Sequence, residues 1–164
     1  MKKTFLLILA LFITTCCMAQ EEELSFPFQG GHKIMDRFFR DSTQFSTTVK
    51  NIKATGMAIF KFSADDKGVV SKIVIYYADD LVLTESILNA LKKSSKKWII
   101  PNHEKIHDFI LPFNISFNIP TNGNAAVQSG YYEFYLHKKA FTSPDQIPMD
   151  ETTLLPTVFL KYDL

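Results

Sequence analysis

The chain has 164 residues, with 18 Lys and Arg against 17 Asp and Glu and only two cysteines. This near balance of charge gives no electrostatic reason to expect nucleic acid or an acidic membrane as a partner. A chain of about 150 residues can bury roughly 70% of its unfolded surface, so one ordinary domain with a hydrophobic core is expected.

The N-terminal segment has the pattern of a secretory signal peptide. Two lysines precede a short apolar run at residues 5–13, and small residues Cys17 and Ala19 lie three and one before Gln20. The run is too short to cross a bilayer, which needs about 20 apolar residues. We therefore expect export with cleavage after Ala19, so that residues 1–19 and both cysteines are removed and the mature chain has no disulfide.

Two alternatives to cleavage stay open. An uncleaved anchor would require the apolar run to extend to Met18. Lipid attachment at Cys16 or Cys17 is the other alternative, although residues 13–15 depart from the usual lipoprotein pattern. We expect a periplasmic or secreted protein whose mature chain is not inserted into the membrane.

Residues 20–119 are expected to form one domain. Ile34, Met35, Phe38 and Phe39 are spaced for one face of a short helix. Residues 41–55 are interpreted as a loosely helical connector. Residues 120–164 are expected to form a β-rich extension that packs on the same domain.

A hairpin and a second helix follow the connector. Two β-prone runs, 56–62 and 69–77, flank a turn at 65–68 whose glycine permits a tight reversal. An apolar stripe predicts a helix over 83–97 that stops before Pro101. Three residues near its start can cap the free N–H groups: Asp79, Asp80 and Thr84.

The clearest strand covers residues 109–119. Six apolar residues alternate along it, which predicts one face packed on a helix and one mostly wet face: Phe109, Leu111, Phe113, Ile115, Phe117 and Ile119. Pro112 cannot donate a ladder hydrogen bond, so a free edge is expected near it. Beyond a turn at 121–124, aromatic residues 131–136 suggest a strand, and residues 158–162 a last short strand.

In their order and spacing, residues 26–119 resemble the C-terminal domain of TonB, the energy-transducing protein of double-membrane bacteria. The matching features are a Phe-Pro-x-x-Gly-Gly start at 26–31, a strand led by Gly56, a Lys-Trp-x-x-Pro signature at 97–101 and a Pro-x-x-x-x-Phe pattern at 112–117. The resemblance implies an α+β fold, with a small antiparallel sheet and two helices packed on one face.

The resemblance also implies a mode of binding. The chain shows no TonB-like membrane helix and no proline-rich rod, so a non-enzymatic binding or structural module is expected rather than an energy transducer. In the family, a receptor segment pairs with the closing strand's edge, which carries over to Phe113, Asn114, Ile115, Ser116 and Phe117. The expected partner is an envelope or outer-membrane receptor protein or peptide.

Two points stay open. A strand at 131–136 could cover it within the same chain, which would leave a structural envelope protein and suppress partner binding. The oligomeric state, including a homodimer, is not determined by the sequence.

One motif suggests different chemistry. His103-Glu104-Lys105-Ile106-His107 fits H-E-x-x-H, in which a helix presents two zinc-binding imidazoles and a glutamate base. It makes a zinc metallohydrolase the alternative function. Pro101 and the strand at 109 leave little room for such a helix, so we favour a connecting loop with no metal site, no cofactor and no catalytic residue.

Overall fold

A computed structural model describes residues 26–119, 125–144 and 152–164. The predicted signal peptide, residues 1–19, and the predicted turn at 121–124 lie outside these ranges. The elements, in chain order, are α2 (His32–Ser42), α3 (Thr47–Asn51), β1 (Gly56–Asp65), β2 (Val70–Ala78), the 3-10 helix η1 (Leu81–Leu83), α4 (Thr84–Lys93), β3 (Ile106–Phe117), α5 (Ala125–His137), β4 (Phe141–Thr142), β5 (Thr153–Leu154) and β6 (Val158–Tyr162).

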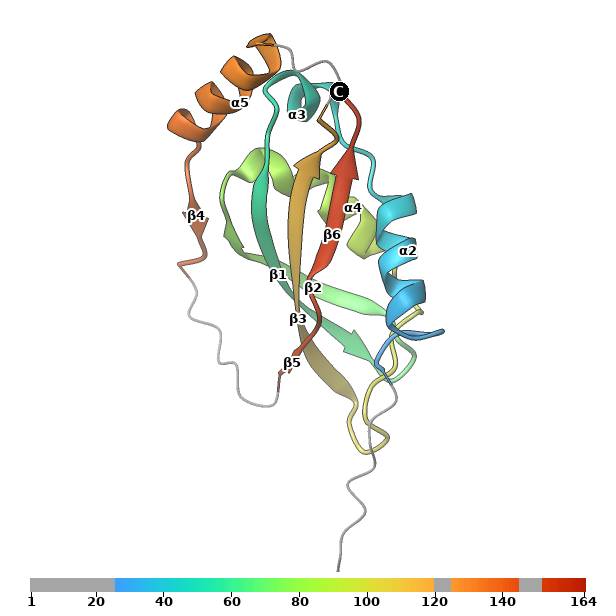
Figure 1. The fold of residues 1–164 in the computed structure, drawn as a ribbon. Coiled ribbons are helices and arrows are strands. Elements are labelled where there is room, and N and C mark those ends of the chain that lie inside the picture. Colours follow the sequence, from blue (N-terminus) through green and yellow to red (C-terminus); the bar gives the residue numbers. More distant parts are fainter. Residues whose placement is uncertain (1–25, 120–124, 145–151) are drawn as a thin grey trace, which may run out of the picture.

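The strands form one mixed sheet, which confirms the α+β class. The order is β4-β2-β1-β3-β5, and β6 also pairs with β3 (Figure 1). The central strands β2, β1 and β3 are antiparallel, as predicted. The extension makes the sheet mixed, because β5 and β6 run parallel to β3. Strand β4 is antiparallel to β2 and therefore runs opposite to β3.

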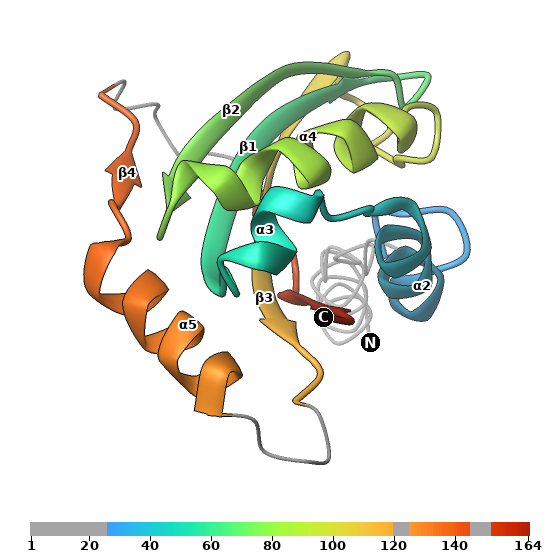
Figure 2. The same ribbon diagram turned by 90° about the horizontal axis from the view of Figure 1, so that it is seen from above.

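Helices α2, α3 and α4 lie on one side of the curved sheet (Figure 2). The predicted first helix is confirmed, with Met35 and Phe39 buried, although Ile34 on the same stripe is exposed. Helix α3 lies within the predicted connector and is capped by the Ser46 side chain. Helix α4 begins and ends inside the predicted range and buries Ile87, Ala90 and Leu91 against the sheet.

Trp98 is the centre of the core. Its ring lies 4.6 Å from that of Phe62, 5.0 Å from that of Phe28 and 5.2 Å from that of Phe109, measured between centroids. Its indole N–H donates to the Ser94 hydroxyl at 2.9 Å, so the polar tip of a buried side chain has a partner. Trp98 therefore joins the N-terminal segment, the exit of α4 and two strands.

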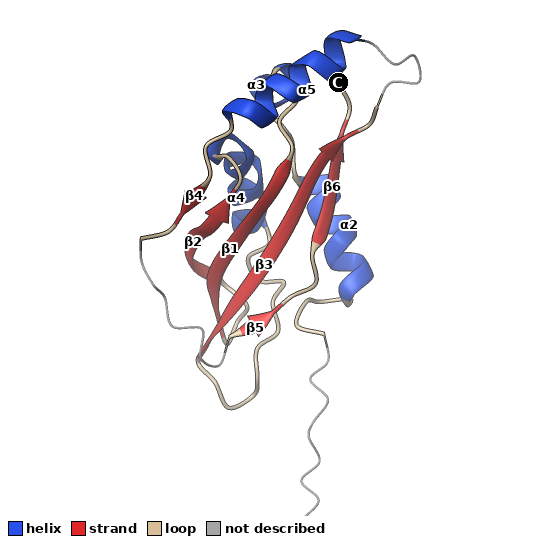
Figure 3. Cartoon of the chain, turned by 60° about the vertical axis from the view of Figure 1, so that its left-hand side comes forward, coloured by secondary structure: helices blue, strands red, loops and turns tan. Residues whose placement is uncertain are grey.

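The extension differs from its prediction in one element. Residues 131–136, expected as a strand, belong to helix α5, which lies across one end of the sheet (Figure 3). Val127, Tyr131 and Phe134 recur every three or four residues along one side of the helix, and Phe134 is its buried residue. This helical spacing prevails over the β-propensity of the aromatic run.

The last predicted strand is confirmed as β6. Val158, Leu160 and Tyr162 are buried, while Phe159 and Lys161 between them are exposed. Within the described ranges, every helix is too short or too polar to span a bilayer.

The hairpin turn leaves no space for a side chain at Gly68, where φ is +72° and a Cβ would lie 2.5 Å from the Trp98 carbonyl oxygen. We predict that Gly68→Ala costs more than about 2 kcal/mol of unfolding free energy, because steric overlap adds to the usual cost of a left-handed residue. Gly31, with φ +82° and nothing within 4 Å of a Cβ, is the matched control and should cost about 1 kcal/mol as Ala. Urea denaturation measures both, and equal losses would contradict the packing argument.

Candidate binding surfaces

The predicted binding edge of β3 is occupied by the protein itself. Its residues pair with β1 on one side and with β6 on the other, from Phe113 opposite Val158 to Phe117 opposite Tyr162. Phe113 and Ile115 point into the core, while Asn114 and Ser116 are half-exposed on the opposite face. The expected free edge at Phe113, Asn114, Ile115, Ser116 and Phe117 is therefore wrong for this structure, since the covering strand is 158–162.

The β6 strand is fixed at its end by Tyr162. The phenol donates to the carbonyl oxygen of Ala54 at 2.8 Å, and the ring lies 5.1 Å from that of Phe45 and 5.9 Å from that of Phe117. Desolvation by burial raises the pKa of Tyr162 to about 12. The neutral phenol is thus a structural part of the junction between β6, β3 and the segment that leads into β1.

A gap in the ladder remains next to Pro112. Strand β5 pairs with Phe109 and Ile110, and β6 pairs from Phe113 onward. Pro112 lies between these two partners and, among the described residues, is paired only with Ile59 of β1. The missing N–H of Pro112 thus falls where neither parallel strand needs a donor.

The opposite edge is protected in another way. Strand β4 pairs only with Tyr77 and Ala78 of β2. The rest of β2 contains register shifts against β1, and Lys72 takes a positive φ of 43° in this stretch. Bulges and a lysine on an edge strand disfavour the addition of another strand.

The H-E-x-x-H segment is not helical. Residues 101–105 form turns, and β3 begins at Ile106. His103 is 84% exposed, whereas His107 is buried in β3, and both lie beside the Glu104 carboxylate, with His103 Nε2 at 3.6 Å and His107 Nδ1 at 2.6 Å. The carboxylate thus lies between the two imidazoles. Among the residues that the structure describes, no group of three or more His, Cys, Asp or Glu could hold a metal ion.

His107 takes part in a different arrangement. Its Nδ1 lies 2.6 Å from the Glu104 carboxylate, and its Nε2 lies 2.7 Å from the Thr153 hydroxyl. Carboxylate, imidazole and hydroxyl follow the order of a hydrolase triad. The imidazole is buried and packs edge-on to Phe109 at 4.8 Å, so the network fastens β5 to the start of β3. Thr153 could not be found from the sequence, because 46 residues separate it from His107.

A second buried polar cluster lies on the sheet face opposite the helices. The Lys61 ammonium lies 2.8 Å from the Asp108 carboxylate, which also accepts a hydrogen bond from the Ser63 hydroxyl at 2.6 Å. Desolvation raises the pKa of Asp108, but the hydrogen bonds from Lys61 and Ser63 and the nearby lysine charges lower it more, and the net pKa lies below its usual value. The cluster stabilises the pairing of β1 with β3.

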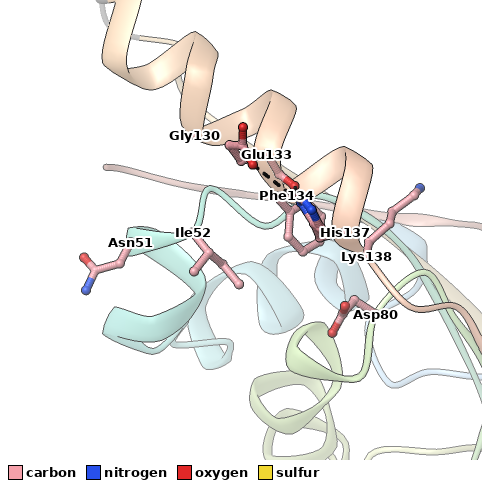
Figure 4. A pocket seen from close by; sticks show the side chains of 8 residues that line it. All are labelled: Asn51, Ile52, Asp80, Gly130, Glu133, Phe134, His137 and Lys138. Atoms are coloured by element: carbon pink, nitrogen blue, oxygen red, sulfur yellow. Dashed lines mark hydrogen bonds and ion pairs between the residues drawn. The ribbon is translucent and has the colours of Figure 1, made fainter.

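Two hollows flank α5. One, of about 440 Å³, lies between α5, α3 and the segment before η1 (Figure 4). Its lining residues are Asn51, Ile52, Asp80, Gly130, Glu133, Phe134, His137 and Lys138. The other, of about 360 Å³, is lined by Thr55, Ser116, Phe117, Ile119 and Tyr131.

Asp79 anchors the C-terminal end of α5. It accepts hydrogen bonds from the Met57 N–H at 2.8 Å and the Tyr77 hydroxyl at 2.7 Å, and it lies 3.4 Å from the Lys138 ammonium. Desolvation raises the pKa of Asp79, but these donors and the Lys138 charge together lower it by more, so the net pKa is below the usual value. Asp79 therefore carries a negative charge beneath the helix rather than capping α4.

Asp80 completes the anchor. One carboxylate oxygen caps η1 by accepting from the Val82 N–H at 2.9 Å, and the other accepts from the Lys139 N–H at 3.1 Å. The predicted capping by Asp80 thus applies to η1. Thr84 is the first residue of α4, and its hydroxyl donates to the Leu81 carbonyl oxygen.

Comparison with protein-family models, curated proteins and solved structures finds no match to this chain.

We predict that Tyr162→Phe costs about 1–2 kcal/mol at neutral pH, because the buried Ala54 carbonyl oxygen loses its donor. The folded pKa of about 12 lies above the ordinary value of 10.0, so the neutral phenol stabilises the fold below pH 10 and this contribution is lost as the pH rises towards 12. The stability difference between wild type and variant, measured by denaturation from pH 8 to 12, should shrink with pH. A constant difference would contradict the assignment.

We predict that Thr153→Val lowers the unfolding free energy by about 1–3 kcal/mol, since the buried His107 imidazole loses a hydrogen-bond partner. Thr142→Val, at an exposed position of the short strand β4, is the control and should change stability by less than about 0.5 kcal/mol. Chemical denaturation compares the two, and equal effects would mean that the Glu104–His107–Thr153 network does not hold β5.

Proposed function

We propose that this chain is an exported, non-enzymatic envelope protein of TonB C-terminal-like build, whose acceptor edge is closed by its own strand β6. The observation that carries the proposal is the parallel pairing of β6 along Phe113 to Phe117, the stretch that the family resemblance assigns to a receptor segment. The edge accepts an added strand, and in this protein that strand is part of the same chain.

The energetics favour a permanent cap over a displaceable one. Val158, Leu160 and Tyr162 are all buried. Each such side chain contributes roughly 1.5–3 kcal/mol when buried, and the backbone ladder adds to this. Together they are comparable with the 5–15 kcal/mol that stabilises a typical domain. A partner strand would have to replace all of these contacts to bind at the same edge.

A second candidate is recognition of an envelope protein or peptide by strand exchange. The alternation of β6 favours it, because a partner segment with apolar residues at the positions of Val158, Leu160 and Tyr162 would fit the same register. Exposed Phe159 and Lys161 are not needed for seating. The two candidates differ in whether β6 leaves the edge in the folded protein.

A labelled peptide of residues 156–164 tests the proposal with two variants of β6. Leu160→Asp places a charge in the core and should release β6, so that the peptide binds with micromolar affinity and raises the melting temperature. Phe159→Asp alters a side chain that is 64% exposed on the same strand and, like wild type, should bind no peptide. Fluorescence anisotropy reads the binding, and circular dichroism the melting. Equal binding by wild type and Leu160→Asp would instead support strand exchange.

A further inference from the structure

Helix α5 carries several large apolar side chains that the rest of the described structure leaves exposed. One flank of the helix carries Ser129, Glu133 and His137, and the rest of its axis is mostly apolar or aromatic, yet only Phe134 is buried against the rest of the described structure. An apolar stripe on a helix is normally covered by protein or lipid. The outer side of α5 therefore has the character of a contact surface.

The outer side has a defined pattern. Tyr132, Tyr135 and Leu136 are spaced i, i+3 and i+4, on the side of the helix away from Phe134, and they are 54–59% exposed. Ile119, at the end of β3 next to the hollow under Tyr131, is 80% exposed. Helix α5 and the C-terminal end of β3 lie at the same end of the molecule, where α5 crosses the sheet (Figures 1 and 3).

Charge is arranged along the same helix. Between residues 125 and 139 the only acid is Glu133, which lies beside His137 at 3.5 Å on the flank of the helix. Lys138 and Lys139 follow the apolar stripe, and the Lys138 ammonium lies 5.0 Å from the Tyr135 ring centroid. The carboxylates of Asp79 and Asp80 are held beneath the helix by inward contacts. The Lys138 ammonium is paired with Asp79 beneath the helix, so Lys139 is the cation at the border of the apolar, hydroxyl-tipped outer stripe.

We propose that the α5 surface, made of Tyr132, Tyr135 and Leu136 with Ile119 and Lys139 at its border, docks on a phospholipid bilayer. Tyrosine is favoured at a membrane interface because its ring enters the apolar region while its hydroxyl stays in water. A lysine beside such a stripe, here Lys139, would lie at the depth of the lipid phosphates. The near-neutral charge of the whole chain does not oppose this, since the local arrangement sets the contact.

A second copy of the chain is a weaker fit to this surface. A stable protein interface buries about 800 Å² on each partner. Three side chains of at most about 250 Å² each, of which only 54–59% is exposed, offer roughly half of that area. A bilayer has no such requirement, because a few inserted side chains and cations suffice for reversible binding. This inference does not depend on the closure of the sheet edge by β6.

Vesicle co-sedimentation tests the proposal with the chain from Gln20 onward, because the apolar run before it would itself bind lipid. Vesicles of phosphatidylcholine alone and of phosphatidylcholine with phosphatidylglycerol form the two arms. Wild type should sediment with both and more strongly with the anionic vesicles. The triple variant Tyr132→Ser, Tyr135→Ser, Leu136→Ser should lose roughly tenfold or more in partitioning, since three apolar contacts are removed.

The matched control is Ile106→Ser, Leu154→Ser, Phe159→Ser, which removes three side chains of 62–68% exposure on strands β3, β5 and β6. It should bind vesicles like wild type. Lys139→Gln should remove most of the preference for anionic vesicles while binding to phosphatidylcholine remains. Circular dichroism verifies that each variant is folded.

Three results would overturn the proposal. The first is that wild type sediments with neither kind of vesicle. The second is that the α5 variant and the control variant lose binding equally. The third is a stable dimer in analytical ultracentrifugation that the α5 variant abolishes, which would make a second copy the occupant of the surface.

Discussion

The pairing of β3 on both of its sides is the constraint on which the rest of the molecule depends. Strand β1 pairs with one side of β3 from Ile106 to Ile115, and β5 and β6 share the other side. Because β3 is central rather than marginal, its alternating apolar residues can be fully buried, and the C-terminal segment becomes part of the core. An edge strand with the same sequence would present unpaired backbone and a row of half-covered aromatic rings.

Because β6 covers the outer side of β3, a surface for binding must lie elsewhere on the molecule. Strand β6 fills the outer side of β3, and bulges and Lys72 interrupt the edge at β2. What is left exposed and apolar at one end belongs to α5 and its neighbours. A module that suppresses pairing at its edges can present an aromatic helix without the risk of uncontrolled sheet extension.

Much of the central fold follows from local patterns in the sequence. The hairpin, α4, β3 and β6 are each encoded by periodicity within a few residues, and Trp98 with Gly68 explains why the helix exit meets the hairpin turn. The pairing partner of β3 does not follow, because alternation shows that a strand exists but not which strand lies beside it. The hydrogen bond between His107 and Thr153 also joins residues far apart in the sequence, so local patterns do not predict it either.

The misassigned element, α5, shows a different limit. Its aromatic run has strand propensity, while the spacing of Val127, Tyr131 and Phe134 is helical, and the two signals compete over a short window. A helix of 13 residues is marginal alone. Its helical state therefore depends on Phe134 and on Asp79 and Asp80, which fix its C-terminal end to β2 and η1.

These attachments are few compared with the cluster around Trp98. An ion pair such as Asp79–Lys138, partly exposed to water, contributes at most about 1 kcal/mol. Helix α5 should thus be the least stable helix of the described fold, while the sheet and its capping strand stay intact around it. A weakly held helix can change its packing at little cost in free energy. It is therefore suited to binding at an interface, where a lipid or protein surface can cover the apolar side chains that the domain itself leaves exposed.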